Sequence, residues 1–455
     1  MTYAIRPAET TRVPSGIPYI VANEAAERFS YYGMRAILVI FMTEYLRNAA
    51  GQLAPMSEPE ARQYYHLFST GVYLLPIVGA LLSDAFFGKY RTILWLSLVY
   101  CAGHLALALG DTAAGVNLLS PRAWLAAGLV LIAVGSGGIK PCVSAHVGDQ
   151  FGSGNKHLLP RIFGWFYFSI NLGAAASQLL TPFLLDRAGP EWAFGVPGLL
   201  MGFATLAFWA GRRKFVHIQP AGTAFIKDMF SAEGLSAIGK LAIIYAFVAV
   251  FWSLFDQTGA AWVLQAKRMD RSVFGYEILP SQVQAINPLL IMIFVPLFNY
   301  VVYPAVDRFF PLTPLRKISI GMFLTVPSFL ISAFIAARLD AGHVMHVGWQ
   351  FAAFTIMTAA EVLVSITCLE FSYTQAPNRM KSVIMAVYLL SISLGNLFTS
   401  ATNYVIAEPD GTSRLSDTHY YLFFSGLMMA AAVGFVFVAL RYRERTYIQG
   451  TSDPQ

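Results

Sequence analysis

The stretch NEAAERFSYYGMR (residues 23–35) places charged and polar side chains inside one long, otherwise apolar segment. Spacings of three and four residues put six of them on one broad stripe of a helix: Glu24, Glu27, Arg28, Tyr31, Tyr32 and Arg35. The apolar sequence continues through LVIFM (residues 38–42). A charged side chain at the centre of a membrane helix costs about 2.5 to 3.5 kcal/mol. We therefore expect the stripe to face protein or water; an interfacial segment among lipid headgroups is the alternative.

The composition is that of an integral membrane protein. The 455 residues are 56% hydrophobic and 12% charged, with a mean hydropathy of +0.56, whereas about a quarter of the residues in soluble proteins are charged. Cys101, Cys142 and Cys368 all lie in apolar segments, which predicts small buried side chains rather than disulfides or metal ligands. The opening 15 residues are polar, so we expect no cleavable signal peptide.

Apolar segments near twenty residues long recur along the chain and predict about twelve membrane-spanning helices. Their approximate limits are 17–47, 60–84, 90–110, 122–147, 160–186, 192–212, 238–266, 282–306, 315–338, 347–375, 380–406 and 418–441. A polar stretch after the sixth span divides the chain. The predicted domains are a six-helix bundle at 1–213, a cytoplasmic linker at 214–236 with a short surface helix around 224–230, and a second six-helix bundle at 237–455.

Charge predicts the orientation in the membrane. With both termini inside, 19 of the 31 lysines and arginines fall in inner segments, 9 in outer loops and 3 within spans. The excess of positive charge in inner loops is the usual cytoplasmic signature. We therefore expect both termini to be cytoplasmic, in the plasma membrane or, for a prokaryote, the inner membrane.

The loop between the second and third spans reads GALLSDAFFGKYR (residues 79–91). Two six-span halves joined by a basic loop suggest a transporter of the major facilitator type, and this loop fits the motif that the superfamily carries there. Asp84 is predicted to gate against neighbouring helix ends. The alternative is an ordinary basic loop. Such folds hold substrate between the halves, near the middle of the membrane.

Lys140 lies inside the fourth span, in GSGGIKP (residues 135–141). The glycines permit close helix packing, and a buried ammonium group needs a partner. Glu24 and Glu27 are the candidates. A lysine that is released when its carboxylate takes up a proton would act as a proton switch; a static pair that joins two spans is the alternative.

His66, in the second span, is the kind of side chain whose charge changes near neutral pH. A lone histidine is nevertheless more often structural, and we interpret His104 and His146 as structural. Tyr73 lies seven residues after His66, close to the same helical face.

The second half carries two isolated acids, Asp256 and Glu361, in spans of otherwise low charge. Glu370 lies nine residues after Glu361, about half a helical turn away, so we assign Glu361 to the cavity and Glu370 to a gate. Asn171 and Asn287 could recognise an amide group, or they could join helices by hydrogen bonds.

The expected cavity is therefore bipolar. The first half contributes Arg28, Arg35 and Lys140, and the second contributes Asp256 and Glu361, which together would match a zwitterion. Aromatic side chains would accommodate a varied apolar body. These are Tyr31, Tyr32 and Tyr73, together with Trp252.

On these motifs the sequence closely resembles the proton-coupled oligopeptide transporter (POT) family of the major facilitator superfamily. The matching segments are EAAERFSYYG (24–33), GSGGIKP (135–141), GDQF (148–151), FYFSINLG (166–173), FDQ (255–257) and EFSYTQAP (370–377). They run from the first span to the eleventh. The resemblance implies the major facilitator fold and proton-driven import of di- and tripeptides.

The resemblance also implies residue roles. It places Glu24, Glu27 and Arg28 in proton coupling, and Arg35 and Lys140 beside the peptide carboxylate. It places Glu361 beside the peptide amino terminus. The proton-coupling set, as a whole, is predicted to be Glu24, Glu27, Arg28, His66, Lys140 and Asp256. Tyr32, Tyr73, Asn171 and Asn287 fall at substrate-contact positions.

Three departures from the family pattern matter. The short 213–236 stretch has no room for the two extra helices that many bacterial members insert between the halves. Many bacterial members carry Glu where Asp256 stands, and Asp256 with Tyr65-His66 is similar to the animal peptide transporters instead. The large extracellular domain that those carry before the tenth span is absent, since only residues 339–346 lie there. The match at His66 favours a proton-site role for it.

The sequence leaves other functions open. Nitrate or another anion is carried by some family members, although the retained glutamates favour a zwitterion. A drug–proton exporter and a non-transporting peptide sensor are further alternatives. No nucleophile–base or metal constellation is found in the sequence, so we do not expect an enzyme. We expect protons as the coupling ion without a cofactor, peptides or peptide-like drugs as ligands, and a monomer in the lipid bilayer.

Overall fold

The computed structural model describes residues 3–220, 222, 232–375 and 381–442. Helices make up most of the described chain, and short 3₁₀ or π-helical segments carry the label η. The first half consists of α1 (Ile17–Ile40), η1 (Phe41–Tyr45), α2 (Glu58–Leu74), α3 (Pro76–Leu81), η2 (Leu82–Phe87), α4 (Lys89–Leu109), α5 (Ala113–Val116), α6 (Pro121–Asp149), η3 (Lys156–Leu158), α7 (Leu159–Ala188), α8 (Pro190–Ala210) and η4 (Gly211–Arg213).

The second half repeats this pattern of long helices and adds one short β-hairpin. It consists of α10 (Ala232–Phe255), η5 (Asp256–Gly259), α11 (Ala261–Lys267), β1 (Ser272–Val273), β2 (Tyr276–Glu277), η6 (Pro280–Ala285), α12 (Ile286–Leu297), η7 (Phe298–Val302), α13 (Tyr303–Asp307), α14 (Pro314–Asp340), α15 (Gly348–Glu361), η8 (Val362–Ile366), α16 (Thr367–Gln375), α17 (Lys381–Ile406) and α18 (Asp417–Arg441).

The predicted membrane spans agree with these helices to within a few residues. Among the described residues, eleven helical segments are long and apolar enough to cross a membrane. The remaining long helix is α1 with η1, which carries the charged stripe. The predicted class, an all-α membrane protein of about twelve spans, is confirmed. The exact domain boundaries stay a prediction: α10 already begins within the expected linker, and the surface helix expected at 224–230 lies outside the described residues.

Side-chain caps explain where several membrane helices begin. Ser57, Ser120, Thr313 and Ser416 each accept a hydrogen bond from the backbone N–H three residues later. A capping hydroxyl satisfies one of the N–H groups that the first helical turn leaves without a partner. Each cap therefore fixes the point at which the chain turns back into the apolar layer.

The seventh span is not continuous, unlike the helix expected over 238–266. The α-helix ends at Phe255, and residues Asp256–Gly259 form a 3₁₀ segment before α11 begins. A Cβ atom at Gly259 would lie 1.9 Å from the Tyr65 hydroxyl of α2, so only glycine fits this close approach. The break places the Asp256 carboxylate where the two halves meet.

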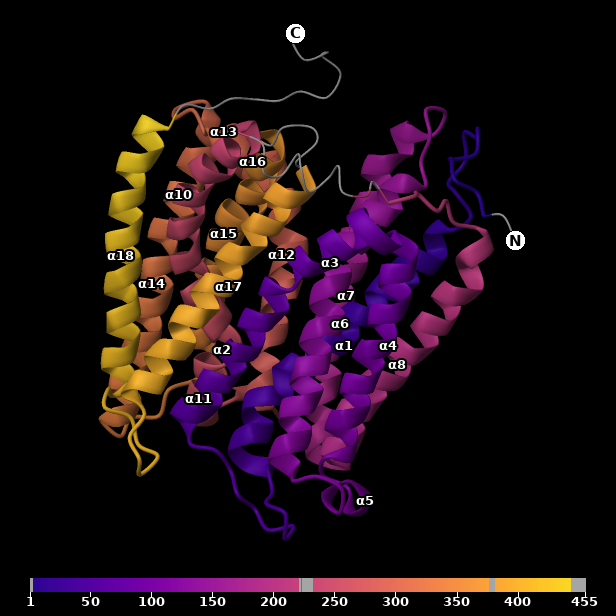
Figure 1. Ribbon diagram of the computed structural model, residues 1–455. Coiled ribbons are helices and arrows are strands. Elements are labelled where there is room, and N and C mark those ends of the chain that lie inside the picture. The colour runs from indigo at the N-terminus through magenta and orange to yellow at the C-terminus, as the bar shows by residue number, and fades with distance from the viewer. Residues whose placement is uncertain (1–2, 221, 223–231, 376–380, 443–455) are drawn as a thin grey trace.

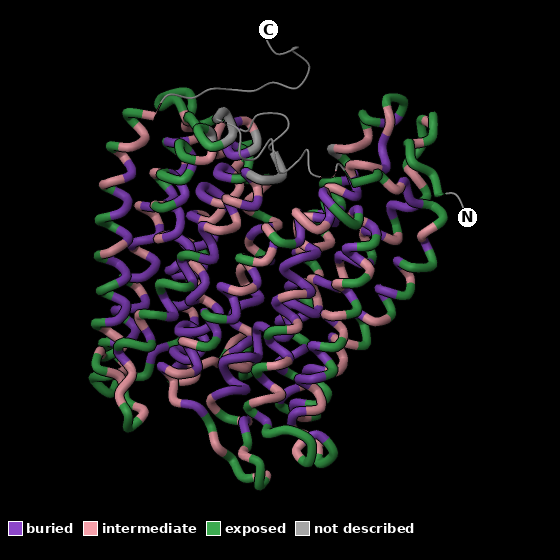
Figure 2. The backbone as a smooth tube through the Cα atoms, viewed as in Figure 1, coloured by how far each residue is buried: buried purple, intermediate pink, exposed green. Residues whose placement is uncertain are grey.

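The helices form two bundles, each with its own apolar core. One buried cluster is centred on α1, α2, α4 and α6, and the other on α10, α14, α17 and α18. Figure 1 shows the two sets side by side, indigo to magenta and orange to yellow. Buried residues gather on the helix faces that turn towards one another (Figure 2). Helix α2 packs against α17, and α7 against α12, so these pairs form the contact between bundles.

The bundles converge at the end of the molecule where α11 is labelled and diverge at the end that carries both termini (Figure 1). Polar contacts join them on the converging side. Ser400 of α17 donates a hydrogen bond to the carbonyl oxygen of Gln63 at 3.0 Å, and Lys267 Nζ lies 2.5 Å from Glu44 Oε1. The structure is thus closed on the side away from the termini.

Candidate functional site

The charged stripe of α1 is buried, which confirms that it faces protein. Glu24 is 2% exposed and Glu27 is fully buried. One guanidinium serves both carboxylates, because Arg28 Nε lies 2.7 Å from Glu24 Oε1 and 3.1 Å from Glu27 Oε2. A buried charge is costly, and pairing with an opposite charge offsets part of that cost. Glu24, Glu27 and Arg28 therefore form one ion-paired group inside the first bundle.

Lys140 does not pair with these carboxylates, so the expected ion pair with Glu24 or Glu27 is wrong for this structure. The ammonium lies 4.2 Å from the ring centre of Tyr31 and 4.3 Å from that of Tyr73. Its Nζ is buried and forms no hydrogen bond within the described chain. Arg28 makes an ion pair with each glutamate, and the negative faces of two aromatic rings hold the lysine instead.

A chain of polar side chains crosses between the bundles. Arg35 Nη2 of α1 lies 2.6 Å from Asp256 Oδ1. The other carboxylate oxygen, Asp256 Oδ2, accepts a hydrogen bond from Asn396 Nδ2 of α17. Asn396 Oδ1 in turn faces His66 Nδ1 of α2 at 2.8 Å. All four side chains are buried, so this network links a titratable imidazole in one bundle to a carboxylate in the other.

The network determines the tautomer of His66. The Asn396 amide nitrogen donates to Asp256, so its carbonyl oxygen must accept, and His66 Nδ1 must carry the hydrogen. His66 Nε2, which has no hydrogen-bond partner among the described residues, is then the atom that can take up a further proton. Sequence reasoning missed Asn396, although a polar residue inside an apolar span was the same signal that singled out Asn171 and Asn287.

Glu361 ends α15 in the second bundle, directly before the π-helical η8. Its Oε2 accepts a hydrogen bond of 2.7 Å from Asn287 Nδ2 of α12. No ion pair to Glu361 is found in the described part of the chain. Asn171 of α7 donates to the Tyr167 carbonyl oxygen of its own helix at 3.0 Å, so part of its amide is already used. The structure thus brings Asn287 and Glu361 together and leaves Asn171 as a separate contact.

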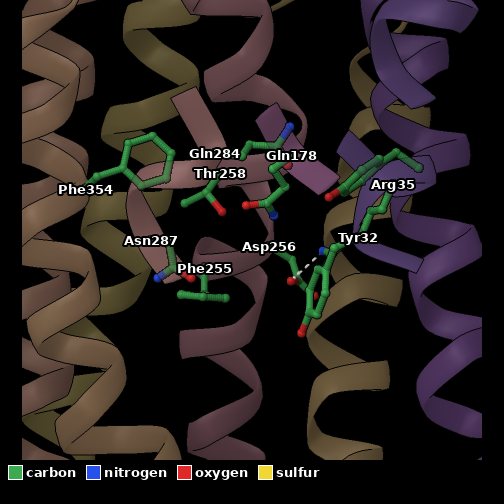
Figure 3. A pocket seen from close by; sticks show the side chains of 11 residues that line it. Tyr32, Arg35, Gln178, Phe255, Asp256, Thr258, Gln284, Asn287 and Phe354 are labelled. Carbon is green, nitrogen blue, oxygen red and sulfur yellow. Dashed lines mark hydrogen bonds and ion pairs between the residues drawn. The ribbon is translucent and has the colours of Figure 1, made fainter. Parts of the chain in front are cut away.

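A cavity of about 40 Å³ lies between the bundles. Its lining residues come from both halves: Tyr32, Arg35, Tyr65, Gln178, Phe255, Asp256, Thr258, Gly259, Gln284, Asn287 and Phe354 (Figure 3). Sequence reasoning predicted four of these and missed the glutamines, which are also polar residues in apolar spans. Binding sites for organic ligands occupy about 300 to 1,000 Å³. The cavity in this structure is therefore too small for an organic ligand, and it must widen to hold one.

The other predicted site residues lie further from this cavity. Trp252 packs edge-on against Phe255, with ring centres 5.3 Å apart, inside the second bundle. Glu370 is exposed on α16, and its assignment to a gate stays a prediction. Asp84 accepts a hydrogen bond of 3.3 Å from the neighbouring Ser83 hydroxyl, and its gating role also stays a prediction.

Comparisons with known proteins place this architecture among transporters. A family model described as "POT family" matches residues 90–235 and 230–421. "Peptide transporter family 1" of Drosophila melanogaster is 37% identical over 367 residues, covering 72% of this chain and 48% of that protein. Human "Solute carrier family 15 member 2" is 33% identical over 395 residues, covering 78% and 53%. The chain thus spans about half the length of the curated relatives it matches.

A solved structure matches over nearly the full length of both chains. It is titled as the crystal structure of an auto-inhibited POT family peptide transporter, and it aligns with a TM-score of 0.83 at 33% identity. The alignment covers 96% of this chain and 99% of that one. The expected major facilitator architecture is confirmed by this match.

Proposed function

The chain belongs to the POT family, and from this premise we propose that it is a proton-coupled symporter that imports di- and tripeptides by alternating access. The fruit-fly relative and the solved structure are both named as peptide transporters, which supports peptides as the substrate class. The two-bundle architecture supports alternating access, since such bundles rock around a site at their interface.

The network Arg35–Asp256–Asn396–His66 carries the proposal of proton coupling. It joins four buried polar side chains from both bundles through three short contacts. A proton taken up by His66 changes the charge beside Asn396. It thereby changes the free energy of the ion pair between Asp256 and Arg35. Protonation is thereby tied to the contact between the bundles, and protons alone would serve as the coupling ion, without a cofactor.

The charge pattern supports a zwitterionic substrate. Of the five charged residues expected around the cavity, Arg28, Arg35 and Asp256 are ion-paired within the protein. For Lys140 and Glu361 no ion pair is found in the described chain, and one belongs to each bundle. A buried charge without a counter-ion is costly, so each is matched best by a ligand group of opposite sign. A peptide carboxylate beside Lys140 and a peptide ammonium beside Glu361 would supply the two counter-ions.

The protein is a multi-pass membrane protein, and its setting in the membrane belongs to the proposal. Positive charge favours cytoplasmic termini, in which case the closed side of the structure faces outwards. We place it in the plasma membrane, or the inner membrane of a prokaryote, acting as a monomer in the lipid bilayer.

Reconstitution tests the transport function directly. Purified protein in proteoliposomes should accumulate radiolabelled dialanine when the outside is acidified, and should accumulate little without a proton gradient. Collapsing the gradient with a protonophore should release the accumulated peptide. Binding of dialanine without any gradient-dependent uptake would contradict the proposal and indicate a peptide sensor.

Replacing His66 by glutamine should flatten the dependence of uptake on external pH, because it removes the titrating end of the network. Asn396→Ala should have a similar effect, since it disconnects His66 from Asp256. His104→Gln is the matched control: His104 is also fully buried, but its Nδ1 bonds to the Phe194 carbonyl oxygen within the first bundle. Uptake is measured from pH 5 to pH 8. A His66→Gln curve that overlays the wild-type curve would return His66 to a structural role.

A further inference from the structure

Three glycines bring α6 unusually close to its neighbours. Added Cβ atoms would lie 2.6 Å from Tyr100 Cβ at Gly135, 2.8 Å from the Val72 carbonyl oxygen at Gly137 and 2.4 Å from Leu96 Cδ1 at Gly138. At Gly135 and Gly137 a larger residue would also meet backbone atoms of a neighbouring helix at 2.8 Å, whereas at Gly138 the end of the Leu96 side chain would have to move. Within the four-residue run 135–138, Ser136 is therefore the one residue that carries a side chain beyond the backbone.

That single side chain contacts the charged stripe. The Ser136 hydroxyl donates a hydrogen bond of 2.6 Å to Glu27 Oε1, and both residues are fully buried. A distance of about 2.5 to 2.7 Å is characteristic of a hydroxyl bound to an ionised carboxylate. The other oxygen, Glu27 Oε2, faces Arg28. Ser136 is thus hydrogen-bonded to one oxygen of the Glu27 carboxylate, and Arg28 makes an ion pair with the other, which accepts no hydrogen bond from the described residues.

Lys140 lies one helical turn after Ser136 on the same helix. Its ammonium is nevertheless held between the rings of Tyr31 and Tyr73 and not against Glu27. The Glu27 carboxylate is instead bonded to Ser136 through Oε1 and lies in ion-pair contact with Arg28 through Oε2. No ion pair between Lys140 and Glu27 is found in the described chain.

We propose that Ser136 is a positioning residue that holds the Glu27 carboxylate to Arg28 and keeps it apart from Lys140. This inference rests on the proposed proton-coupled transport. A hydroxyl donates to an ionised carboxylate and accepts from a protonated one, so the Ser136 contact persists when Glu27 takes up a proton. The attraction of Arg28, in contrast, is strong only for the ionised form. Ser136 thereby keeps Glu27 in place while protonation weakens its contact with Arg28, which stays paired with Glu24.

Other charged and titratable groups also face Glu27, so the effect of Ser136 must be separated from theirs. They are Glu24, Arg28 and Tyr32 of α1, Tyr100 of α4 and Lys140 of α6. Replacing Ser136 leaves all of them in the protein. A change in pH dependence then reports on the hydroxyl alone.

Ser136→Ala should shift the curve of gradient-driven uptake against pH towards higher pH by about one unit, because the ionised carboxylate loses a donor. Ser136→Thr keeps the hydroxyl and should retain the wild-type curve. Ser136→Cys keeps the side-chain size with a weaker donor and should fall between them, which tests the proposal even if the alanine or threonine variant does not fold. Ser425→Ala is the control, since the hydroxyl of this buried serine donates to the Tyr421 carbonyl oxygen of its own helix, α18.

In a Glu27→Gln background, the further change Ser136→Ala should leave the rate of peptide exchange without a gradient unaltered. Curves for Ser136→Ala and Ser136→Cys that coincide with wild type, or that move towards lower pH, would overturn the inference. Absence of gradient-driven uptake in the wild-type protein is a different outcome, because it would overturn the proposed function itself.

Discussion

Lys140→Ala is expected to lower gradient-driven peptide uptake by about 100-fold or more. Removing one member of a buried charge pair costs about 3 to 5 kcal/mol, and each 1.4 kcal/mol corresponds to a factor of ten. In the present structure Lys140 has no counter-ion within the described chain, and Tyr31 and Tyr73 hold its ammonium. The proposed counter-ion is the peptide carboxylate, so the variant should lose substrate binding, and exchange without a gradient should fall as well.

Glu27→Gln is expected to abolish gradient-driven uptake for a different reason. The neutral amide neither ionises nor takes up a proton, so the pH-dependent ion pair with Arg28 is lost. Substrate contacts remain, and exchange of peptide without a gradient should therefore be retained in large part. The contrast between the two variants separates the proton switch from the substrate site.

Lys317→Ala provides a control for general damage. Lys317 of α14 also lies over a tyrosine ring, at 4.0 Å from the centre of Tyr303, but at a helix end in the second bundle. Its loss should change uptake by no more than about twofold, since surface charge contacts contribute little. Both rates are measured in proteoliposomes with labelled dialanine. A wild-type gradient-driven rate in Lys140→Ala would remove the proposed carboxylate site, and a wild-type rate in Glu27→Gln would remove the proposed proton switch.

The positions of the membrane helices could be predicted from the sequence because their signal is local. A run of apolar residues near twenty, bounded by caps such as Ser57 or Ser120, determines where a helix begins and ends regardless of its neighbours. The stripe of α1 follows from the same local periodicity. For this reason the spans and the buried face of residues 24–35 match the structure closely.

The pairing of side chains could not be predicted in this way. Asp256 lies 221 residues after Arg35 in sequence, and Asn396 lies 330 residues after His66, yet each pair is in contact. Periodicity identifies which residues are buried and polar, but it does not decide which cation meets which carboxylate. Charge alone favoured Lys140 with Glu24 or Glu27, whereas both carboxylates make ion pairs with the adjacent Arg28 and Glu27 is also bonded to the Ser136 hydroxyl.

Local helix geometry also departs from what periodicity assumes. The half-turn separation of Glu361 and Glu370 was derived for a continuous α-helix, but the π-helical segment η8 lies between them. The break at Asp256 is a further case, because the 3₁₀ turn forms against Tyr65 from the other bundle. Such irregular turns depend on tertiary contacts, and they occur here beside the residues proposed to act in transport.

Glu361→Ala should weaken the binding of free dipeptides by about 2 to 5 kcal/mol, or about 30-fold to several thousandfold. The carboxylate is bound by the Asn287 amide at 2.7 Å and has no cationic partner in the described chain. A peptide ammonium would supply that partner. Glu361→Gln should lose nearly as much affinity, because it removes the charge but keeps an oxygen for Asn287. Glu408→Ala, which breaks an exposed ion pair with Arg414, should leave affinity unchanged.

N-acetylated dipeptides provide the second side of a thermodynamic cycle. Acetylation removes the ammonium, so these ligands should already bind weakly to the wild-type protein and lose little more in Glu361→Ala. Four dissociation constants, for two ligands on two proteins, then give the coupling energy between the carboxylate and the peptide amino terminus. If the losses of binding free energy from acetylation and from Glu361→Ala simply add when both changes are made, the Glu361 carboxylate and the peptide ammonium are not in contact. Glu361 would then serve the packing of α12 against α15 through Asn287, and the ammonium would have to be bound elsewhere in the cavity.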